Sequence, residues 1–206
     1  MISATEALER LRAGNGRFVA NHPEFQAHTG VNQRTELAMG QSPFAVILGC
    51  SDSRVPVEII FDQGLGELFV IRVAGNIIGE TVIGSIEFAA AQLGTRLVVV
   101  LGHSQCGAVS AAFDAHEHGE EDLSPSLRSI VNRILPSVHA VPDSQAPREA
   151  QLDLAVRQNV RTSVERLRHG SAIVENAISN EGLRVVGANY DLLTGVVDFF
   201  DGVPLE

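Results

Sequence analysis

Short apolar runs alternate with longer helical patterns along this chain. Uninterrupted apolar stretches bounded by glycine or polar residues predict buried strands over residues 44–48, 67–73, 97–101, 183–188 and 196–200. Between them, apolar residues recur at helical spacing and predict helices over residues 81–93, 107–118, 148–168 and 171–180. Strands that alternate with helices indicate an α/β fold, with a mostly parallel β-sheet flanked by helices. A turn at Thr194-Gly195 predicts an antiparallel edge strand at the C-terminus.

Three other segments add detail to this pattern. The helix expected over residues 81–93 is apolar on nearly all sides, which predicts that it is buried. A helix of about two turns is expected after the first strand, with Pro56 in its first turn. Residues 119–147 contain four prolines and are interpreted as an insertion with one amphipathic helix.

The N-terminal segment predicts a helix outside the sheet. Ser3 and Glu6 have the spacing of a capping box, and apolar residues then recur near the helical period. This amphipathic helix has no obvious partner in its own segment. We therefore expect one domain, residues 1–206, made of a helical arm (1–40) and an α/β core (41–206). The arm would lie across its own domain or across a neighbouring subunit.

Composition narrows the classes of partner. The chain has 206 residues and a net charge of −10, without a basic run, so nucleic acid and anionic membranes are not expected partners. No apolar stretch approaches the roughly 20 residues that a membrane helix needs. The first residues lack the basic start and apolar core of a signal peptide, so a cytoplasmic protein is expected.

Metal-binding side chains follow two of the predicted strands. Cys50 and Asp52 come directly after the first strand, and His103 and Cys106 come after the strand over residues 97–101. Ligands bind at the carboxyl ends of the strands in open α/β sheets, so these four side chains are expected to meet. Thiolate, imidazole and carboxylate are all zinc ligands, and the set predicts one Zn²⁺ per chain.

The acidic ligand suggests that the site can open. An aspartate is a weaker zinc donor than a thiolate, and Arg54 lies close enough along the chain to pair with Asp52. We therefore expect a latch, in which Asp52 on zinc closes the site and Asp52 on Arg54 opens it. Cys50 and Cys106 are the only two cysteines, so a disulfide between them, or two inert buried thiols, is the alternative interpretation.

These motifs resemble a known family. Cys-Ser-Asp-Ser-Arg at 50–54 and Gly-His-Ser-Gln-Cys-Gly at 102–107 are similar to the β-class carbonic anhydrases, and the similarity covers nearly the whole chain. The supporting motifs are Phe61-Asp62-Gln63-Gly64-Leu65-Gly66, Val73-Ala74-Gly75-Asn76, Ser85-Ile86-Glu87-Phe88 and Gly187-Ala188-Asn189-Tyr190-Asp191. The resemblance implies a lyase that hydrates CO2 reversibly to bicarbonate and a proton, by attack of zinc-bound hydroxide.

The resemblance also implies roles for individual residues. Cys50, His103 and Cys106 would be zinc ligands, and Asp52 with Arg54 would form the catalytic dyad, with Asp52 also able to ligate zinc. The candidate substrate-binding residues are Gln41, Val55, Phe69, Phe88 and Gly107. Gln41 and Phe69 match the plant-like branch of the family, whereas Phe88 stands where that branch often has tyrosine.

An assembly follows from the same resemblance. It implies an obligate homodimer, often assembled further into a homotetramer, with the N-terminal helix wrapped over the neighbour. Gln41 and the pocket phenylalanines would then come from the partner subunit.

Three rival interpretations remain open at the level of sequence. Gly102-His103-Ser104-Gln105 is similar to the nucleophile elbow of a serine hydrolase, but Cys106 occupies the position of the last glycine. The four ligands would also suit a zinc site that only holds the sheet together. An enzyme on the same scaffold that hydrolyses a CO2 analogue such as carbon disulfide would have the same ligands.

Overall fold

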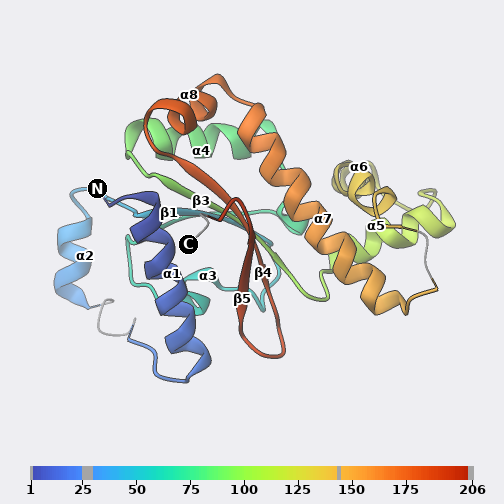
Figure 1. Ribbon diagram of the computed structural model, residues 1–206, viewed down its shortest axis with the longest axis horizontal. Helices are drawn as coiled ribbons and strands as arrows, with labels where there is room; N and C mark the ends of the chain where they lie inside the picture. The colour runs from blue at the N-terminus through green and yellow to red at the C-terminus, as the bar shows by residue number, and fades with distance from the viewer. Residues whose placement is uncertain (1, 25–29, 143–144, 204–206) are drawn as a thin grey trace.

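A parallel sheet forms the centre of the structure (Figure 1). In the computed structural model, which describes residues 2–24, 30–142 and 145–203, five strands are hydrogen-bonded in the order β2-β1-β3-β4-β5. The strands are β1 (Ala45–Gly49), β2 (Leu68–Arg72), β3 (Leu97–His103), β4 (Arg184–Tyr190) and β5 (Val197–Asp201). All neighbours are parallel except β4 and β5, which are antiparallel. The predicted α/β fold and its antiparallel C-terminal edge are confirmed.

The two central strands are buried on both faces. In β1, Ile47 packs into the core on one face, whereas Val46 and Leu48 pack into the core on the other face. In β3, Val99 packs into the same core as Ile47, and Val100 packs into the same core as Val46 and Leu48. This period of two explains why these strands appear in the sequence as continuous apolar runs.

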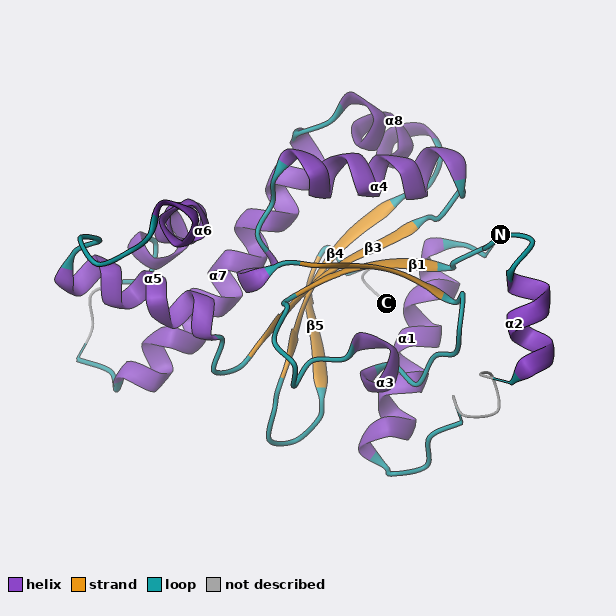
Figure 2. Ribbon diagram, turned by 180° about the vertical axis from the view of Figure 1, so that it is seen from behind, coloured by secondary structure: helices purple, strands orange, loops and turns teal. Residues whose placement is uncertain are grey.

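Helices cover both faces of the sheet (Figure 2). One face carries α1 (Ala4–Val19) and α3 (Val57–Ile60), and the other carries α4 (Glu80–Gln92), α7 (Arg148–His169) and α8 (Ala172–Asn180). A third core joins α5 (Gly107–His118) and α6 (Pro125–His139) to α7. Helix α2 (Val31–Leu37) lies at the opposite end of the molecule from α5 and α6 (Figure 1). Parts of the expected arm and insertion, residues 1, 25–29 and 143–144, lie outside the described residues, as do residues 204–206.

The N-terminal helix packs on its own chain. Ser3 and Glu6 form the predicted capping box at the start of α1. Ala7, Leu8 and Leu11 are buried in the core that α1 shares with β1 and β3. Helix α1 therefore lies across its own domain, and its buried apolar residues are covered by its own chain.

Two helices differ from their predictions. Helix α3 has four residues instead of about two turns, with Pro56 as its N-cap, because the chain turns away at Asp62, whose φ is 50°. Helix α4 is not buried all round: Val82, Ile86 and Ala89 face the sheet, but Phe88 is 48 % exposed. Only one side of α4 meets the sheet, so its other apolar side lies open. Among the described residues, every helix is too short or too polar to span a bilayer.

The packing of α1 predicts opposite effects for two neighbouring glycines. A Cβ on Gly14 would collide with the carbonyl oxygen of Phe61, whereas a Cβ on Gly16 would have nothing within 4 Å. Gly16→Ala should raise the free energy of unfolding by about 0.5–1 kcal/mol, because alanine favours helix. Gly14→Ala should lower it by about 1–3 kcal/mol, because the backbone must shift. Urea unfolding measures both, and equal effects of the two substitutions would contradict this packing.

Candidate metal centre

The candidate site lies where the chain reverses its direction of travel across the sheet. From β1 the chain runs to β2 on one side and then crosses to β3 on the other side of β1. Such a switch point leaves a crevice at the carboxyl ends of the two central strands. Cys50 directly follows β1, His103 ends β3, and Cys106 is the N-cap of α5. The fold therefore brings three separated sequence positions to one edge of the sheet.

Three of the four expected ligands converge there. The ligand atoms of Cys50, His103 and Cys106 all lie within 4.8 Å of one another, and all three residues are buried. The two sulfur atoms are 4.0 Å apart, about twice the length of an S–S bond, and both cysteines are free. The disulfide interpretation is therefore wrong for this structure.

His103 presents a lone pair to the two sulfurs. Its Nδ1 lies 2.9 Å from the carbonyl oxygen of Ser104, and because a carbonyl only accepts, Nδ1 carries the proton. The other ring nitrogen, Nε2, carries the lone pair of the neutral ring, and it is buried and without a hydrogen-bond partner among the described residues. Two sulfurs and one such imidazole nitrogen are a donor set that suits Zn²⁺.

The two thiols share one proton. The two sulfurs lie within hydrogen-bonding distance of each other, and this bond lowers the pKa of one thiol, Cys50, to about 4. The same bond, together with burial, raises the pKa of Cys106 well above its usual range. Backbone N–H groups also point at the sulfurs, including that of Gly75, 3.3 Å from Cys50 Sγ. The hydrogen bond between the two sulfurs therefore favours ionisation of one of the two thiols.

Asp52 lies beside this group but outside it. Its carboxylate makes two hydrogen bonds with the Arg54 guanidinium, Nε to Oδ1 at 2.9 Å and Nη2 to Oδ2 at 2.7 Å. This pairing lowers the pKa of Asp52 below its usual range. Asp52 Oδ2 is nevertheless only 3.9 Å from His103 Nε2. The carboxylate is thus placed as the latch hypothesis requires for an open site, and close enough to compete for a metal.

Arg72 is a functional candidate that the sequence reasoning missed. It ends β2 opposite Gly49, and its guanidinium donates to the carbonyl oxygens of Cys50 (2.9 Å) and Asp52 (2.5 Å). It thereby fixes the backbone of the loop that carries both residues. A lone arginine at the carboxyl end of an apolar strand was the available signal.

The expected substrate residues fall into two groups. Val55 is fully buried next to the dyad, and Gly107 begins α5 directly after Cys106, so both lie at the site. Gln41 precedes the other end of β1, and Phe69 pairs with Val46 near that end. Phe88 packs against Phe69, with ring centroids 6.3 Å apart.

The second group cannot reach the metal ligands of its own chain. At about 3.3 Å per residue, Ala45 and Gly49 are separated by about 13 Å along β1. Gln41 and the Phe69–Phe88 pair therefore lie toward the opposite edge of the sheet from Cys50.

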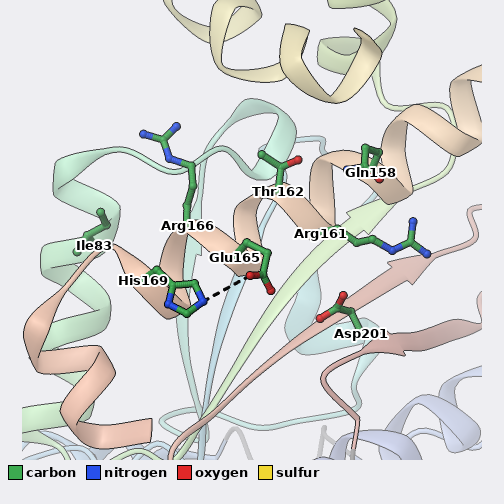
Figure 3. Close-up of a pocket in the computed structure, with 9 residues that line it drawn as sticks. Ile83, Gln158, Arg161, Thr162, Glu165, Arg166, His169 and Asp201 are labelled. Carbon is green, nitrogen blue, oxygen red and sulfur yellow. Dashed lines mark ion pairs between the residues drawn. The ribbon is translucent and has the colours of Figure 1, made fainter. Parts of the chain in front are cut away.

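Other polar clusters lack this convergence. A cavity of about 820 Å³ follows α7, but Figure 3 shows Arg161 and Arg166 pointing in different directions and Glu165 paired with His169. At the end of α5, both Asp114 and Glu117 are already paired with Arg148. Neither cluster contains a buried donor without a partner, within the part of the chain that the structure describes.

Sequence comparison gives one family. A family model described as carbonic anhydrase matches residues 45–197. Carbonic anhydrase 2 of Mycobacterium tuberculosis is 42 % identical over 189 residues, which cover 92 % of this chain and 89 % of that protein. A carbonic anhydrase of Pseudomonas aeruginosa is 36 % identical over 177 residues, covering 81 % of this chain and 77 % of that protein.

Solved structures agree with the sequence comparison. The β-carbonic anhydrase CcaA superposes with a TM-score of 0.75 and 26 % identity, covering 97 % of this chain and 93 % of that chain. The β-carbonic anhydrase CafA of Aspergillus fumigatus superposes with a TM-score of 0.70 and 29 % identity, covering 94 % and 90 %.

The shared thiol proton predicts the number of protons that zinc displaces. The hydrogen bond between the two sulfurs lowers the pKa of one thiol and raises that of the other, so at pH 7 the pair is expected to carry about one proton. Zinc needs both sulfurs as thiolates, so binding should release about one proton per chain. Two ordinary thiols would release about two. An indicator dye in weak buffer, with metal-free protein titrated by zinc, measures the number, and a value near two would contradict the shared proton.

Proposed function

The chain belongs to the carbonic anhydrase family, with β-class enzymes as its structural neighbours, and on that premise we propose that it hydrates CO2 reversibly at a zinc ion. Cys50, His103 and Cys106 would hold the metal. The observation that carries this proposal is their convergence, within 4.8 Å, around a buried imidazole nitrogen that has no hydrogen-bond partner in the described part of the chain. Zinc bound there would supply the Lewis acidity that makes water a nucleophile near neutral pH.

The dyad controls access and orientation. Held by Arg54, the Asp52 carboxylate is ionised and stays off the metal ligands. From 3.9 Å away from His103 Nε2, it can accept a hydrogen bond from the attacking water and direct that water's lone pair toward CO2. Arg72 holds the backbone carbonyl groups of Cys50 and Asp52 in place, so only the side chain of Asp52 has to move when its carboxylate changes partner.

The substrate pocket requires a second copy of the chain. CO2 is small and apolar, so it needs apolar walls and one donor for the oxygen that becomes anionic. Val55 supplies a wall from the same chain, whereas Gln41, Phe69 and Phe88 lie toward the far edge of the sheet. We therefore assign these three, as in the plant-like branch, to the site of the partner subunit in a homodimer. The half-exposed Phe88 is suited to such an interface.

The remaining expectations are part of the same proposal. Residues 1–206 act as one domain, with residues 1–40 as its helical arm. Two metal-binding thiols suit a reducing compartment, which favours the cytoplasm. Assembly beyond the dimer, into a tetramer, remains a prediction.

Stopped-flow CO2 hydration on protein of known zinc content tests the function, and Arg54→Ala is the informative variant. Without Arg54, Asp52 is free to occupy the metal and exclude water. The variant should therefore keep one zinc per chain, and its kcat should fall by a factor of about 10²–10⁴.

Arg157→Ala is the matched control, because Arg157 pairs with Asp153 and Asp198 on the surface and should leave turnover unchanged. Normal hydration by Arg54→Ala would refute the latch. If the zinc-loaded protein hydrolyses carbon disulfide in a parallel assay but does not hydrate CO2, then CO2 is not its substrate.

The shared pocket makes a prediction about mixed dimers. Gln41→Ala should lower kcat/KM by about 10²–10³, because it removes the donor to the developing anion. Its zinc content and dimerisation should not change. Cys50→Ala should be inactive through loss of zinc. Mixing the two variants should restore part of the activity, because one site of each hybrid dimer contains neither substitution. If subunits exchange and no activity returns, Gln41 does not act across the interface.

A further inference from the structure

A strained turn lies directly behind the candidate zinc site. The 3₁₀ turn η2 (Ala74–Asn76) contains two consecutive residues with left-handed backbone, Gly75 at φ 69° and Asn76 at φ 44°. Such a pair is costly, especially for a residue with a side chain, and needs support from its surroundings. Packing is part of that support, since a Cβ on Gly75 would lie 2.7 Å from Ile134 Cδ1 and 3.1 Å from Ala108 Cβ.

The turn aims one peptide group at a metal ligand. The N–H of Gly75 donates to Cys50 Sγ at 3.3 Å. A hydrogen bond to a thiolate draws electron density away from the sulfur and fixes the direction of its lone pairs. This matters here because two thiolates cancel the formal charge of Zn²⁺, which weakens its action as a Lewis acid. By withdrawing electron density from Cys50 Sγ, the Gly75 N–H leaves more positive charge on a bound zinc ion.

Two buried polar side chains of α7 hold this turn. Asn159 is 2 % exposed, and its Nδ2 donates to the carbonyl oxygen of Gly75 at 2.7 Å. One turn of helix later, the Ser163 hydroxyl donates to the carbonyl oxygen of Asn76 at 3.2 Å. Both interrupt a helix face that is otherwise apolar, with Val156, Val160 and Val164 buried. A buried polar residue in such a face lowers stability unless its hydrogen bonds are made. These hydrogen bonds therefore fix how Asn159 and Ser163 sit against the turn.

We propose that Asn159 is a positioning residue for the zinc site, and that it acts through the carbonyl group and the N–H group of Gly75. Its amide fixes the Gly75 carbonyl, the carbonyl fixes the rotation of the strained turn, and the turn directs the Gly75 N–H to Cys50 Sγ. Asn159 touches neither zinc nor substrate. The inference rests on the proposed function, because it assigns to α7 a control over the donor strength of one zinc ligand.

Asn159→Leu tests this with two readouts that do not depend on catalysis. Leucine has the same branched shape and the same number of side-chain heavy atoms, but it cannot hold the Gly75 carbonyl. The zinc dissociation constant, measured by competition with a chelator, should rise about 10- to 100-fold, because Cys50 is no longer held in its ligating orientation and this loss outweighs the stronger donation of the sulfur. In cobalt-substituted protein, the sulfur-to-cobalt charge-transfer absorption should move to longer wavelength, because the thiolate becomes a stronger donor. Asn159→Ala, which removes the same bond without adding apolar atoms, should show both changes and replaces the leucine variant if that one does not fold.

Ser137→Ala is the matched control. Ser137 is fully buried on α6 and donates to the hydroxyl of Thr162 on α7, so its loss removes a part-buried hydrogen bond that involves neither Gly75 nor Cys50. This variant should lose stability while keeping the zinc affinity and the cobalt absorption of the unmodified protein.

Three results would overturn the inference. Unchanged affinity and absorption in the Asn159 variants would show that Asn159 only stabilises the fold. Equal loss of affinity in Ser137→Ala would show that any weakening of α7 has the same effect. An unmodified protein without sulfur-to-cobalt absorption would refute the thiolate metal site itself, and the proposed function with it.

Discussion

The parallel pairing of β1 with β3 is the constraint on which the rest of the structure depends. The two strands run side by side, with Val46 to Gly49 aligned with Val98 to Leu101, so their carboxyl ends meet at one edge. Packing on both faces holds this register, because a one-residue slip would exchange the side chains that meet the two cores. The positions of Cys50 and His103 follow directly from it. Only Cys106 needs a further element, the start of α5.

Hydrogen-bond donors surround the two buried sulfurs and offset their negative charge. Two thiolates are costly to bury, and the chain surrounds them with donors: the N–H of Gly75 on Cys50, and backbone groups at the start of α5 on Cys106. Two arginines, Arg54 and Arg72, lie on the loop side and fix Asp52 by its carboxylate and its carbonyl. These hydrogen bonds fix the backbone around the sulfurs and pair the Asp52 carboxylate with Arg54.

Much of this arrangement could be predicted from the sequence, because it depends on local patterns. The strand runs, the capping box of α1 and the Cys–Asp and His–Cys spacings are local, and the edge rule for α/β sheets then places the ligands together. Contacts between distant segments could not be predicted in the same way. Arg72 and Asn159 each act on the site through backbone carbonyl groups, which leave no motif. The burial of α4 was overestimated because its pattern is apolar on both sides, and only the sheet decides which side is covered.

The central claim is that two sulfurs and one imidazole bind zinc and leave one position for water. Extended X-ray absorption at the zinc edge of the purified protein tests it most directly. We expect two sulfur neighbours at about 2.3 Å and two nitrogen or oxygen neighbours at about 2.0–2.1 Å, one of them with the outer-shell pattern of imidazole. Zinc with no sulfur neighbour, or with a single one, would contradict the assignment of Cys50 and Cys106, and with it the proposed chemistry.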